Sequence, residues 1–235
     1  MNREEFILEC SKIGIKVTDE QLLLLDKYYK LLIEWNNKIN LTAITEENEV
    51  YLKHFYDSLT LYKTIDLNKS IKVCDVGSGA GFPGIVLKIF FKDLNIVLVD
   101  SLQKRVNYLN EVINSLGLKG IYAIHSRMED YSKTHIEEFD VITARAVAKI
   151  GILSEIAVKA LKVNGYLIFM KGNAREEIEA FSQKSDLLGL SLNETVEFLL
   201  PFENSNRTLV KYKKIFKTKD KYPRRMDIIK KEYMS

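Results

Sequence analysis

A glycine-rich segment at residues 75–84, with the sequence DVGSGAGFPG, holds the residues best suited to chemistry in this chain. It overlaps an apolar run at 71–76, which is typical of a buried parallel strand. The glycines at positions 77, 79 and 81 permit a tight turn and let a ligand approach bare main chain. Pro83 suits the first turn of a helix, which we predict at 83–91. The segment therefore predicts a strand, a ligand-binding turn and a helix; a tight turn without a ligand is the alternative.

The residues around these glycines indicate which ligand they serve. Asp100 ends a second apolar run, 23 residues after Gly77, and a carboxylate there can accept hydrogen bonds from both hydroxyls of a ribose. Asp75 would repel a pyrophosphate but suits the cationic amino group of a methionine moiety. A dinucleotide site has the pattern G-x-G-x-x-G, whereas the three glycines here form G-x-G-x-G and Phe82 follows them. The pattern is similar to the first motif of Rossmann-like methyltransferases that use S-adenosylmethionine, and we expect that cofactor.

Two further strand ends are predicted to contribute. Glu129 follows the strand predicted at 121–125, where it could accept a hydrogen bond from the adenine amine while Met128 packs against the ring. The alternative is that Glu129 merely begins a helix, where acids favour the positive end of the dipole. Arg145 follows the strand predicted at 140–144, where methyl donor and acceptor should meet; a surface salt bridge is its alternative. The predicted cofactor-binding residues are Asp75, Gly77, Gly79, Gly81, Phe82, Asp100, Met128, Glu129 and Arg145.

Several catalytic patterns are missing from the sequence. The place after the fourth predicted strand lacks the D/N-P-P-Y/F cluster that accompanies methylation of exocyclic amines, and neither Cys10 nor Cys74 lies in a predicted catalytic loop. None of the three histidines has a partner at metal-ligand spacing, so we expect no metal. His54, Asp57 and Ser58 predict a local hydrogen-bond cluster, with an acid/base pair as the alternative. The absence of an identified general base favours a nucleophile with its own lone pair, such as guanine N7.

The elements that must position these residues change character near residue 65. Before it apolar residues recur at helical intervals, and after it strands and helices alternate, which predicts a mainly parallel sheet. We expect an α/β, Rossmann-like class I methyltransferase fold: a seven-stranded, mainly parallel sheet with its last strand antiparallel, plus an N-terminal helical extension. The predicted helices are 4–13, 19–40, 46–63, 83–91, 103–116, 150–161 and 174–188, and the predicted strands are 71–76, 96–99, 121–125, 140–144, 166–170, 194–200 and 208–216.

Length and composition bound the organisation. The chain has 235 residues, 46% of them hydrophobic, which is enough for one α/β domain with a helical extension. We expect the extension at 1–65 to pack on a methyltransferase domain at 66–218, with a basic tail at 219–235. Two distant cysteines, the lack of a signal-peptide pattern and the lack of a membrane-length apolar run predict a cytoplasmic protein without membrane association. We expect a monomer.

The net charge of +3 is unevenly distributed. Residues 211–235 hold ten of the 35 Lys and Arg residues and three of the 32 Asp and Glu residues, so this segment carries +7 and the rest −4. A basic segment on a slightly acidic body suggests an affinity for polyanions such as nucleic acids. The alternative is a solvated strand end followed by a frayed terminus.

A set of short motifs spreads over nearly the whole chain. Its most specific part is the G-x-G-x-G-x-P-G loop at 77–84 with the D-S-x-x-K-R segment at 100–105. The others are Trp35-Asn36 with Lys38, Asn40-Leu41-Thr42, His54-Phe55-Tyr56-Asp57-Ser58-Leu59, Arg127-Met128-Glu129, Thr143-Ala144-Arg145-Ala146, Lys171-Gly172 and Tyr222-Pro223-Arg224-Arg225. This set resembles the RsmG (GidB) family of methyltransferases, although the segment after Arg225 lacks the Gly and Pro usual in family tails.

The resemblance implies methylation of guanine N7 in the decoding region (530 loop) of bacterial 16S rRNA. The partner would be 16S rRNA or an assembly intermediate of the small ribosomal subunit. The resemblance assigns cofactor contacts to Gly77, Phe82, Met128, Glu129 and Arg145. The basic residues expected to grip RNA phosphates are Lys104, Arg105, Arg127, Arg207, Arg224 and Arg225, with solvated surface charge as their alternative.

The mechanism that we expect is direct in-line methyl transfer. Proximity and alignment would supply most of the acceleration. Arg145 or Lys171 could hold guanine O6 while N7 attacks the methyl group. Three alternatives stay open: a small-molecule methyltransferase, an NAD-type dehydrogenase, and a noncatalytic ribosome-assembly factor.

Overall fold

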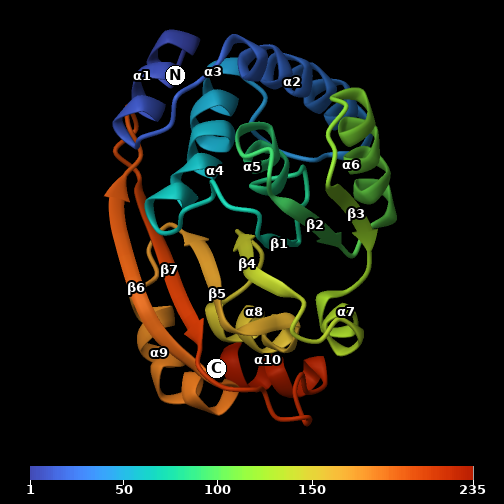
Figure 1. Cartoon of the computed structure of the whole chain (residues 1–235), viewed down its shortest axis with the longest axis vertical. Coiled ribbons are helices and arrows are strands. Elements are labelled where there is room, and N and C mark those ends of the chain that lie inside the picture. Colours follow the sequence, from blue (N-terminus) through green and yellow to red (C-terminus); the bar gives the residue numbers. More distant parts are fainter. Residues whose placement is uncertain (235) are drawn as a thin grey trace.

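A seven-stranded sheet forms the centre of the computed structural model, which describes residues 1–234 (Figure 1). Its strands are β1 (Lys72–Val76), β2 (Asn95–Asp100), β3 (Ile121–His125), β4 (Phe139–Arg145), β5 (Leu161–Lys171), β6 (Leu190–Leu199) and β7 (Asn206–Lys214). They lie in the order β3-β2-β1-β4-β5-β7-β6. The first five are parallel to their neighbours in that group, and β7 lies antiparallel between β5 and β6. The predicted sheet, with its antiparallel last strand, is confirmed.

Both faces of the central strands β1 and β2 are buried. Successive residues of a strand point to opposite faces, so Val73 and Ile96 contact one core whereas Cys74 and Val97 contact the other. A strand that is covered on both faces needs apolar residues at every position, which is why these strands are continuous apolar runs. The carboxyl ends of β1, β2, β4 and β5 meet at one edge, because these strands are parallel.

The N-terminal helices cover one face together with two helices of the alternating region (Figure 1). The first two begin at capping boxes, in which the side chains of Asn2 and Thr18 accept the main-chain N–H groups of Glu5 and Gln21. Buried residues of all six helices belong to one core cluster, so the N-terminal segment and the sheet share a hydrophobic core. These helices are α1 (Arg3–Lys12), α2 (Asp19–Ile39), α3 (Glu47–Val50), α4 (Asp57–Leu59), α5 (Gly84–Phe90) and α6 (Gln103–Ser115).

The helix predicted at 46–63 is continuous but irregular. A π-helical turn at Tyr51–Tyr56 joins α3 to α4, and a 3₁₀ turn at Thr60–Lys63 follows. Such π-helical turns are rare and occur frequently at functional sites. This turn carries His54, which contributes to the cavity described below.

Four helices cover the opposite face of the sheet (Figure 1). They are α7 (Met128–Thr134), α8 (Ile150–Ala157), α9 (Arg175–Ser185) and α10 (Met226–Met234). The sequence pattern predicts no helix in the C-terminal segment. Ile229 of α10 is nevertheless fully buried, and the ring of Tyr233 lies so close to Gly151 of α8 that no larger residue would fit there. The packing of this short amphipathic segment onto α8 therefore stabilises it as a helix, in place of a frayed terminus.

Two strand boundaries differ from the prediction by four residues or more. β5 begins at Leu161 instead of 166, and β6 begins at Leu190 instead of 194. The segment 162–165 is polar and contains glycine, so its sequence suggested a loop, but Leu161 pairs with Phe139 of β4. No helix among residues 1–234 is long and apolar enough to cross a membrane.

Candidate active site

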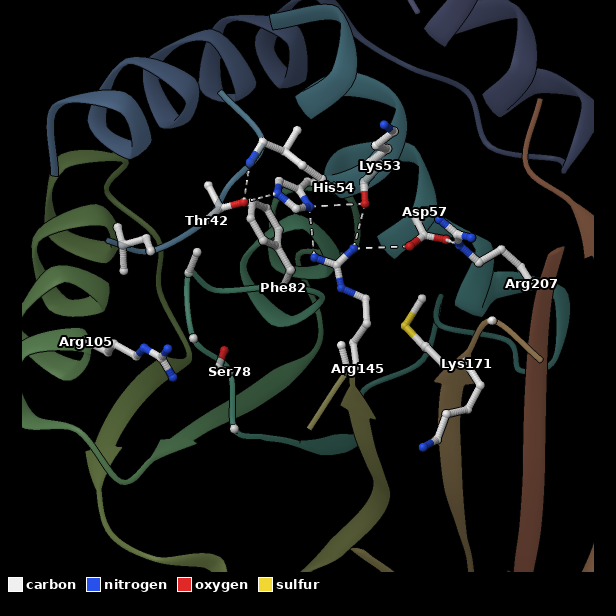
Figure 2. A pocket seen from close by; sticks show the side chains of 18 residues that line it. Thr42, Lys53, His54, Asp57, Ser78, Phe82, Arg105, Arg145, Lys171 and Arg207 are labelled. Carbon is white, nitrogen blue, oxygen red and sulfur yellow. Dashed lines mark hydrogen bonds and ion pairs between the residues drawn. The ribbon is translucent and has the colours of Figure 1, made fainter. Parts of the chain in front are cut away.

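A cavity of about 410 Å³ opens at the carboxyl edge of the sheet (Figure 2). One wall is the turn after β1, and a second consists of residues at the ends of β4 and β5 and the start of β7. The third wall comes from the N-terminal helical segment, which thereby closes the cavity over the strand ends. The polar or aromatic side chains on these walls are those of Thr42, Lys53, His54, Asp57, Ser78, Phe82, Arg105, Arg145, Lys171 and Arg207.

The turn after β1 adopts a conformation that only glycine accommodates without strain. Gly77 has φ +65°, and a Cβ atom at this position would lie 2.7 Å from the Val147 side chain. Gly81 has φ +95°, and its Cβ would lie 2.5 Å from the Tyr28 hydroxyl. That hydroxyl donates a hydrogen bond of 2.5 Å to the carbonyl oxygen of Ala80. Helix α2 thus holds the glycine turn from outside, while the turn presents main chain to the cavity.

The carboxylates of Asp75 and Asp100, at the ends of β1 and β2, accept hydrogen bonds from this turn. Asp75 is fully buried, and its Oδ2 accepts hydrogen bonds from Ser78 Oγ at 2.7 Å and Gly84 N at 3.0 Å. Its Oδ1 has no hydrogen-bond partner among the described residues, and burial raises the pKa of this carboxyl to about 6. Asp100 accepts from the main-chain N–H groups of Gly79 and Leu102, both at 2.9 Å. Both carboxylates lie behind the cavity lining, so their contacts with a cofactor stay a prediction.

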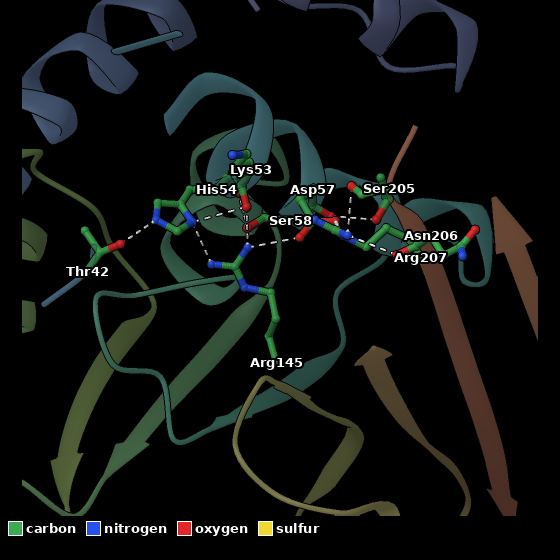
Figure 3. A network of polar contacts seen from close by, with 10 residues as sticks. Thr42, Lys53, His54, Asp57, Ser58, Arg145, Ser205, Asn206 and Arg207 are labelled. Atoms are coloured by element: carbon green, nitrogen blue, oxygen red, sulfur yellow. Dashed lines mark hydrogen bonds and ion pairs between the residues drawn. The ribbon is translucent and has the colours of Figure 1, made fainter. Parts of the chain in front are cut away.

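Arg145 is held against the N-terminal wall by three groups (Figure 3). Its Nη1 donates to the carbonyl oxygen of Lys53 at 2.8 Å and to Oδ2 of Asp57 at 3.2 Å. Its Nη2 lies 3.1 Å from Nδ1 of His54. The guanidinium also lies over the Phe82 ring, 5.1 Å from its centroid, in a cation–π contact. The surface salt bridge considered from the sequence is therefore wrong: the ion pair of Arg145 lies inside the cavity wall.

His54 is neutral in this arrangement. A guanidinium only donates hydrogen bonds, so Nδ1 of His54 accepts from Arg145 and Nε2 carries the proton toward Thr42 Oγ1, 3.0 Å away. Nδ1 also lies 3.1 Å from the carbonyl oxygen of Lys53, which Arg145 already occupies as a donor. Burial and the positive charge of Arg145 lower the pKa of His54 to about 3. The ring stacks on Phe82 with centroids 4.5 Å apart, which suits a positioning role.

Asp57 pairs two arginines from distant parts of the sequence. Its Oδ1 accepts from Nε of Arg207 at 3.0 Å while its Oδ2 accepts from Arg145. Arg207 Nη1 also donates to Ser205 Oγ at 3.2 Å, so β7 is tied to the same network. The predicted cluster of His54, Asp57 and Ser58 forms only in part. Ser58 donates to the carbonyl oxygen of His54, whereas the Asp57 carboxylate is directed at the arginines.

Lys171 lines the cavity, but its amine is engaged elsewhere. Nζ donates to the carbonyl oxygen of Ala148 at 2.7 Å and forms an ion pair with Glu177 at 2.9 Å. In Figure 2 the amine points away from the guanidinium of Arg145. Lys171 is therefore less well placed than Arg145 to bind a substrate atom.

Met128 and Glu129 lie at the beginning of α7 and outside the cavity lining. Met128 is buried in the core beneath α7, and Glu129 lies 3.7 Å from Arg127. An acid in the first turn of a helix is the arrangement that the sequence offered as an alternative, and the structure contains it. Of the predicted cofactor residues, those that line the cavity are Gly77, Gly79, Phe82 and Arg145, and those that do not are Asp75, Gly81, Asp100, Met128 and Glu129.

The basic residues predicted to grip RNA fall into three groups. Arg105 and Arg207 line the cavity and pair with Asp100 and Asp57 respectively. Lys104, Arg127 and Arg225 are exposed. Arg224 is different, because its main-chain N–H, Nε and Nη2 all donate to the fully buried carboxylate of Glu155, at 3.0, 2.8 and 2.7 Å. This contact gives Arg224 a structural role in place of the predicted phosphate contact.

Part of the charge of the basic segment is internal. Lys214 is fully buried and donates to the carbonyl oxygens of Leu161 and Val158. Lys211 is buried and donates to the carbonyl oxygen of Thr64 at 2.5 Å. These two amines therefore act as structural donors, so the +7 charge overstates what this segment offers to a polyanion.

The residues of the N-terminal wall were missed as site residues. Thr42, Lys53, His54 and Asp57 carry no spacing that marks them as partners of a strand end more than 80 residues away. The signals for Thr42, His54 and Asp57 were that they belong to the motifs quoted for the resemblance and that His54 and Asp57 predict a local hydrogen-bond cluster; Lys53 had no signal. Among residues 1–234, no group of three His, Cys, Asp or Glu side chains is arranged to hold a metal ion.

Comparison with known proteins gives a consistent result. A family model described as "GidB: rRNA small subunit methyltransferase G" matches residues 21–212. Ribosomal RNA small subunit methyltransferase G of Desulforamulus reducens is 49% identical, over 93% of this chain and 92% of its own length. The protein of that name from Bacillus cytotoxicus is 46% identical, over 96% and 95%. A SAM dependent methyltransferase from Aquifex aeolicus has the same fold: its structure covers 72% of this chain and 94% of its own, with TM-score 0.52 and 21% identity.

Proposed function

This chain belongs to the GidB family, rRNA small subunit methyltransferase G, and on that premise we propose that it methylates guanine N7 in the decoding region of 16S rRNA. S-adenosylmethionine is the methyl donor. The substrate in this proposal is 16S rRNA or an assembly intermediate of the small subunit. The choice of a ring nitrogen rests on His54 beside Arg145. His54 is neutral, and both of its ring nitrogens already form hydrogen bonds, so it is not available as a base.

The residues present fit S-adenosylmethionine. The buried Oδ1 of Asp75 lacks a partner, and a cationic amino group is the donor that such a carboxylate oxygen prefers. The glycine turn lines the cavity at Gly77, Ser78 and Gly79, and the two glycines leave its main chain bare. We assign the cofactor to the glycine turn, with Asp100 and Glu129 as further acceptors. When bound, the cofactor supplies an electrophilic methyl group on a sulfonium.

Arg145 orients the guanine in this mechanism. A guanidinium has five N–H donors, and Lys53, Asp57 and His54 engage three of them among the described residues. The remaining donors can bind guanine O6, an acceptor next to N7. Because Asp57 and His54 fix the guanidinium before substrate arrives, orientation costs less entropy, and alignment of this kind can lower a barrier by roughly 7–11 kcal/mol.

No side chain in the cavity is required to remove a proton. His54 has a pKa of about 3 and its Nδ1 already accepts from Arg145, so it is unsuited to act as a base near neutral pH. Guanine N7 carries a free lone pair and needs no deprotonation before it attacks. The arrangement therefore favours in-line transfer to a ring nitrogen over methylation of an amine that must lose a proton.

The remaining assignments complete the proposal. We assign residues 1–65 as a helical extension that forms one wall of the site, 66–218 as the methyltransferase domain and 219–235 as a C-terminal segment. The enzyme acts as a cytoplasmic monomer without a metal. We assign phosphate contacts to Lys104, Arg105, Arg127, Arg207 and Arg225, which are exposed or line the cavity.

Transfer of labelled methyl groups from S-adenosylmethionine to ribosomal RNA tests the proposal. Unmodified 16S rRNA and intact small subunits are compared as substrates, and the modified base is then mapped. Gly77→Ala should abolish transfer, because its Cβ would collide with Val147. Gly117→Ala is the matched control: Gly117 has the same φ of +65°, but its Cβ would meet nothing within 4 Å.

Each outcome decides between functions. Label on one guanine N7, retained in Gly117→Ala and lost in Gly77→Ala, supports donor, substrate and site together. Label on another atom of the RNA refutes N7 but keeps the enzyme class. Cofactor binding without transfer to any ribosomal RNA refutes the RNA substrate, and activity on a free metabolite would then identify a small-molecule methyltransferase.

A further inference from the structure

A second cavity lies beside the first at the carboxyl edge of the sheet. Its volume is about 430 Å³, and it is lined by residues that follow β5, end β6 and begin β7. Arg207 lines both cavities, so the two share a wall. The residues that matter for its chemistry are Asn173, Arg175, Glu197, Leu199, Asn206 and Arg207.

The polar residues of this cavity suit the edge of a nucleobase. Glu197 offers only acceptors, whereas the amides of Asn173 and Asn206 offer donors and acceptors. A phosphate inside the cavity would be repelled by Glu197. Arg175 also lines the cavity, but its side chain is 83% exposed at the beginning of α9, where it pairs with Glu179 and can meet a phosphate from the solvent side. Donors and acceptors together with an exposed cation match an unpaired nucleotide.

Apolar surface for stacking is exposed at the same end of the hairpin. Leu199 lines the cavity and is 54% exposed. In the turn that follows, Phe202 is 56% exposed and has φ +69°, a left-handed conformation that is unfavourable for an aromatic residue. Glu203 of this turn forms an ion pair of 2.6 Å with Lys53, which lines the first cavity. The turn is therefore anchored to the site while its aromatic ring stays exposed.

We propose that the second cavity binds an unpaired nucleotide that flanks the methylated guanine. Its base would lie against Leu199, with Glu197 and Asn206 binding its edge. Sequence-specific proteins bind RNA mostly at unpaired bases, which they stack on side chains and read along their edges. Arg207 would separate the two bases, and its ion pair with Asp57 links the occupancy of this cavity to the position of Arg145. The proposal rests on the proposed function, because it requires an RNA substrate.

The test compares substrate kinetics and binding in two variants, Glu197→Gln and Phe202→Ala. Each should raise the KM for the ribosomal RNA substrate, and its filter-binding Kd, by roughly 5- to 20-fold, since stacked and edge-bound bases contribute on that scale. The kcat and the affinity for S-adenosylmethionine, measured by equilibrium dialysis, should stay within about 2-fold of wild type, because neither side chain lines the first cavity.

Matched controls come from β6 and from the segment that follows β7. Glu194→Gln alters an acid of β6 that is 43% exposed and pairs with Lys211, outside the second cavity. Phe216→Ala removes a ring that is 44% exposed beyond the opposite end of β7. Both controls should leave the KM for RNA unchanged.

The outcomes separate this proposal from the function on which it rests. Raised KM and Kd for RNA in Glu197→Gln, which alters the cavity, and in Phe202→Ala, which alters the adjacent turn, support it when the controls are unchanged. If wild type methylates ribosomal RNA and these two variants match it, the proposal is overturned and the function stands. If wild type methylates no ribosomal RNA, the proposed function fails first and the nucleotide site fails with it.

Discussion

Two buried carboxylates, Asp57 and Glu155, each hold an arginine, but their surroundings differ. Glu155 accepts three hydrogen bonds from Arg224, beneath α10 on one face of the sheet. Asp57 divides its two oxygens between Arg145 and Arg207 on the wall of the first cavity (Figure 3). One carboxylate binds a single arginine, whereas the other joins strands β4 and β7.

The difference indicates how to distinguish an ion pair that only stabilises the fold from one that belongs to a binding site. The Glu155 pair fixes a helix to the body and leaves its carboxylate no free acceptor toward a cavity. The Asp57 network leaves N–H donors of Arg145 next to open volume, so it can bind a substrate atom. Both Arg224 and Arg145 form an ion pair with a buried carboxylate. They differ because the remaining N–H donors of Arg145 face a cavity.

The largest expected effect is that of Arg145→Ala on activity. Loss of a preorganised donor should lower the single-turnover rate of methyl transfer by roughly 10²- to 10³-fold. Asp57 would keep its bond to Arg207, so stability should fall less than in Arg224→Ala. Rate and cofactor affinity are measured on the same preparation. Equal losses in the transfer rate and in the cofactor affinity would show that Arg145 only binds the cofactor. The contrast between Arg145 and Arg224 would then no longer distinguish a substrate-binding arginine from a structural one.

Arg224→Ala should mainly destabilise the protein. The variant leaves the buried carboxylate of Glu155 unpaired, which costs about 3 kcal/mol and lowers the Tm by about 6–12 °C. Denaturant unfolding measures this loss, and the activity of the folded variant should match wild type. Arg225→Ala is the control, because Arg225 is 83% exposed and, within residues 1–234, pairs only with Asp227. If Arg224→Ala weakened RNA binding without loss of stability, the structural role of Arg224 would be contradicted.

The pH dependence of stability should depend on His54. Its pKa is about 3 in the folded state and 6.5 in the unfolded state, so the unfolded chain binds the extra proton between these values. This contribution to stability is present above pH 6.5 and is lost as the pH falls. Asp75 has the opposite sign, since its folded-state pKa of about 6 exceeds 3.8 and its contribution is lost as the pH rises through 6.

Urea unfolding of His54→Gln isolates the contribution of His54 to the pH dependence of stability. Between pH 6 and pH 5, wild type should lose roughly 1 kcal/mol more stability than His54→Gln, since one proton contributes at most about 1.4 kcal/mol per pH unit. Arg224→Ala should keep the wild-type slope. An identical slope in His54→Gln would mean that the imidazole is charged in the folded protein, against the tautomer inferred here.

The smallest expected effect is that of Tyr28→Phe, which tests whether α2 supports the glycine turn. The variant removes the hydrogen bond to Ala80 and should cost about 1 kcal/mol of stability. Cofactor affinity should weaken with it, because the turn loses its outer support. Tyr108→Phe is a matched control from the same core, since the buried Tyr108 hydroxyl has no partner among the described residues. Equal affinity in both variants would limit Tyr28 to packing.

Local sequence patterns were sufficient to predict most of the fold. Apolar runs and glycines gave the strands and the turn after β1, because a strand buried on both faces and a left-handed turn leave local signatures. Helix α10 was missed because its nine residues become helical only when Ile229 and Tyr233 pack on the body. The beginning of β5 was missed because its pairing with β4 outweighs a loop-like sequence.

The site was predictable only on its strand side. Gly77, Phe82 and Arg145 follow strands, and parallel strands bring their carboxyl ends to one edge. The contact between Arg145 and Asp57 joins residues 88 positions apart, and that between Arg224 and Glu155 joins residues 69 apart. No spacing in a single sequence encodes such pairs. The sequence therefore could not distinguish an arginine that lines the cavity from one that fixes a helix to the rest of the protein.

Biosynthesis proceeds from the N-terminus, and the order β5-β7-β6 delays completion of this protein. β6 is translated before β7, although in the described part of the chain β7 is its sole neighbour in the sheet. A nascent chain that ends before residue 206 therefore has an unpaired β6 and an open edge on β5. Arg207 emerges with that last strand. A ribosome-bound chain thus gains the final wall of its cavity in the same step that closes its sheet.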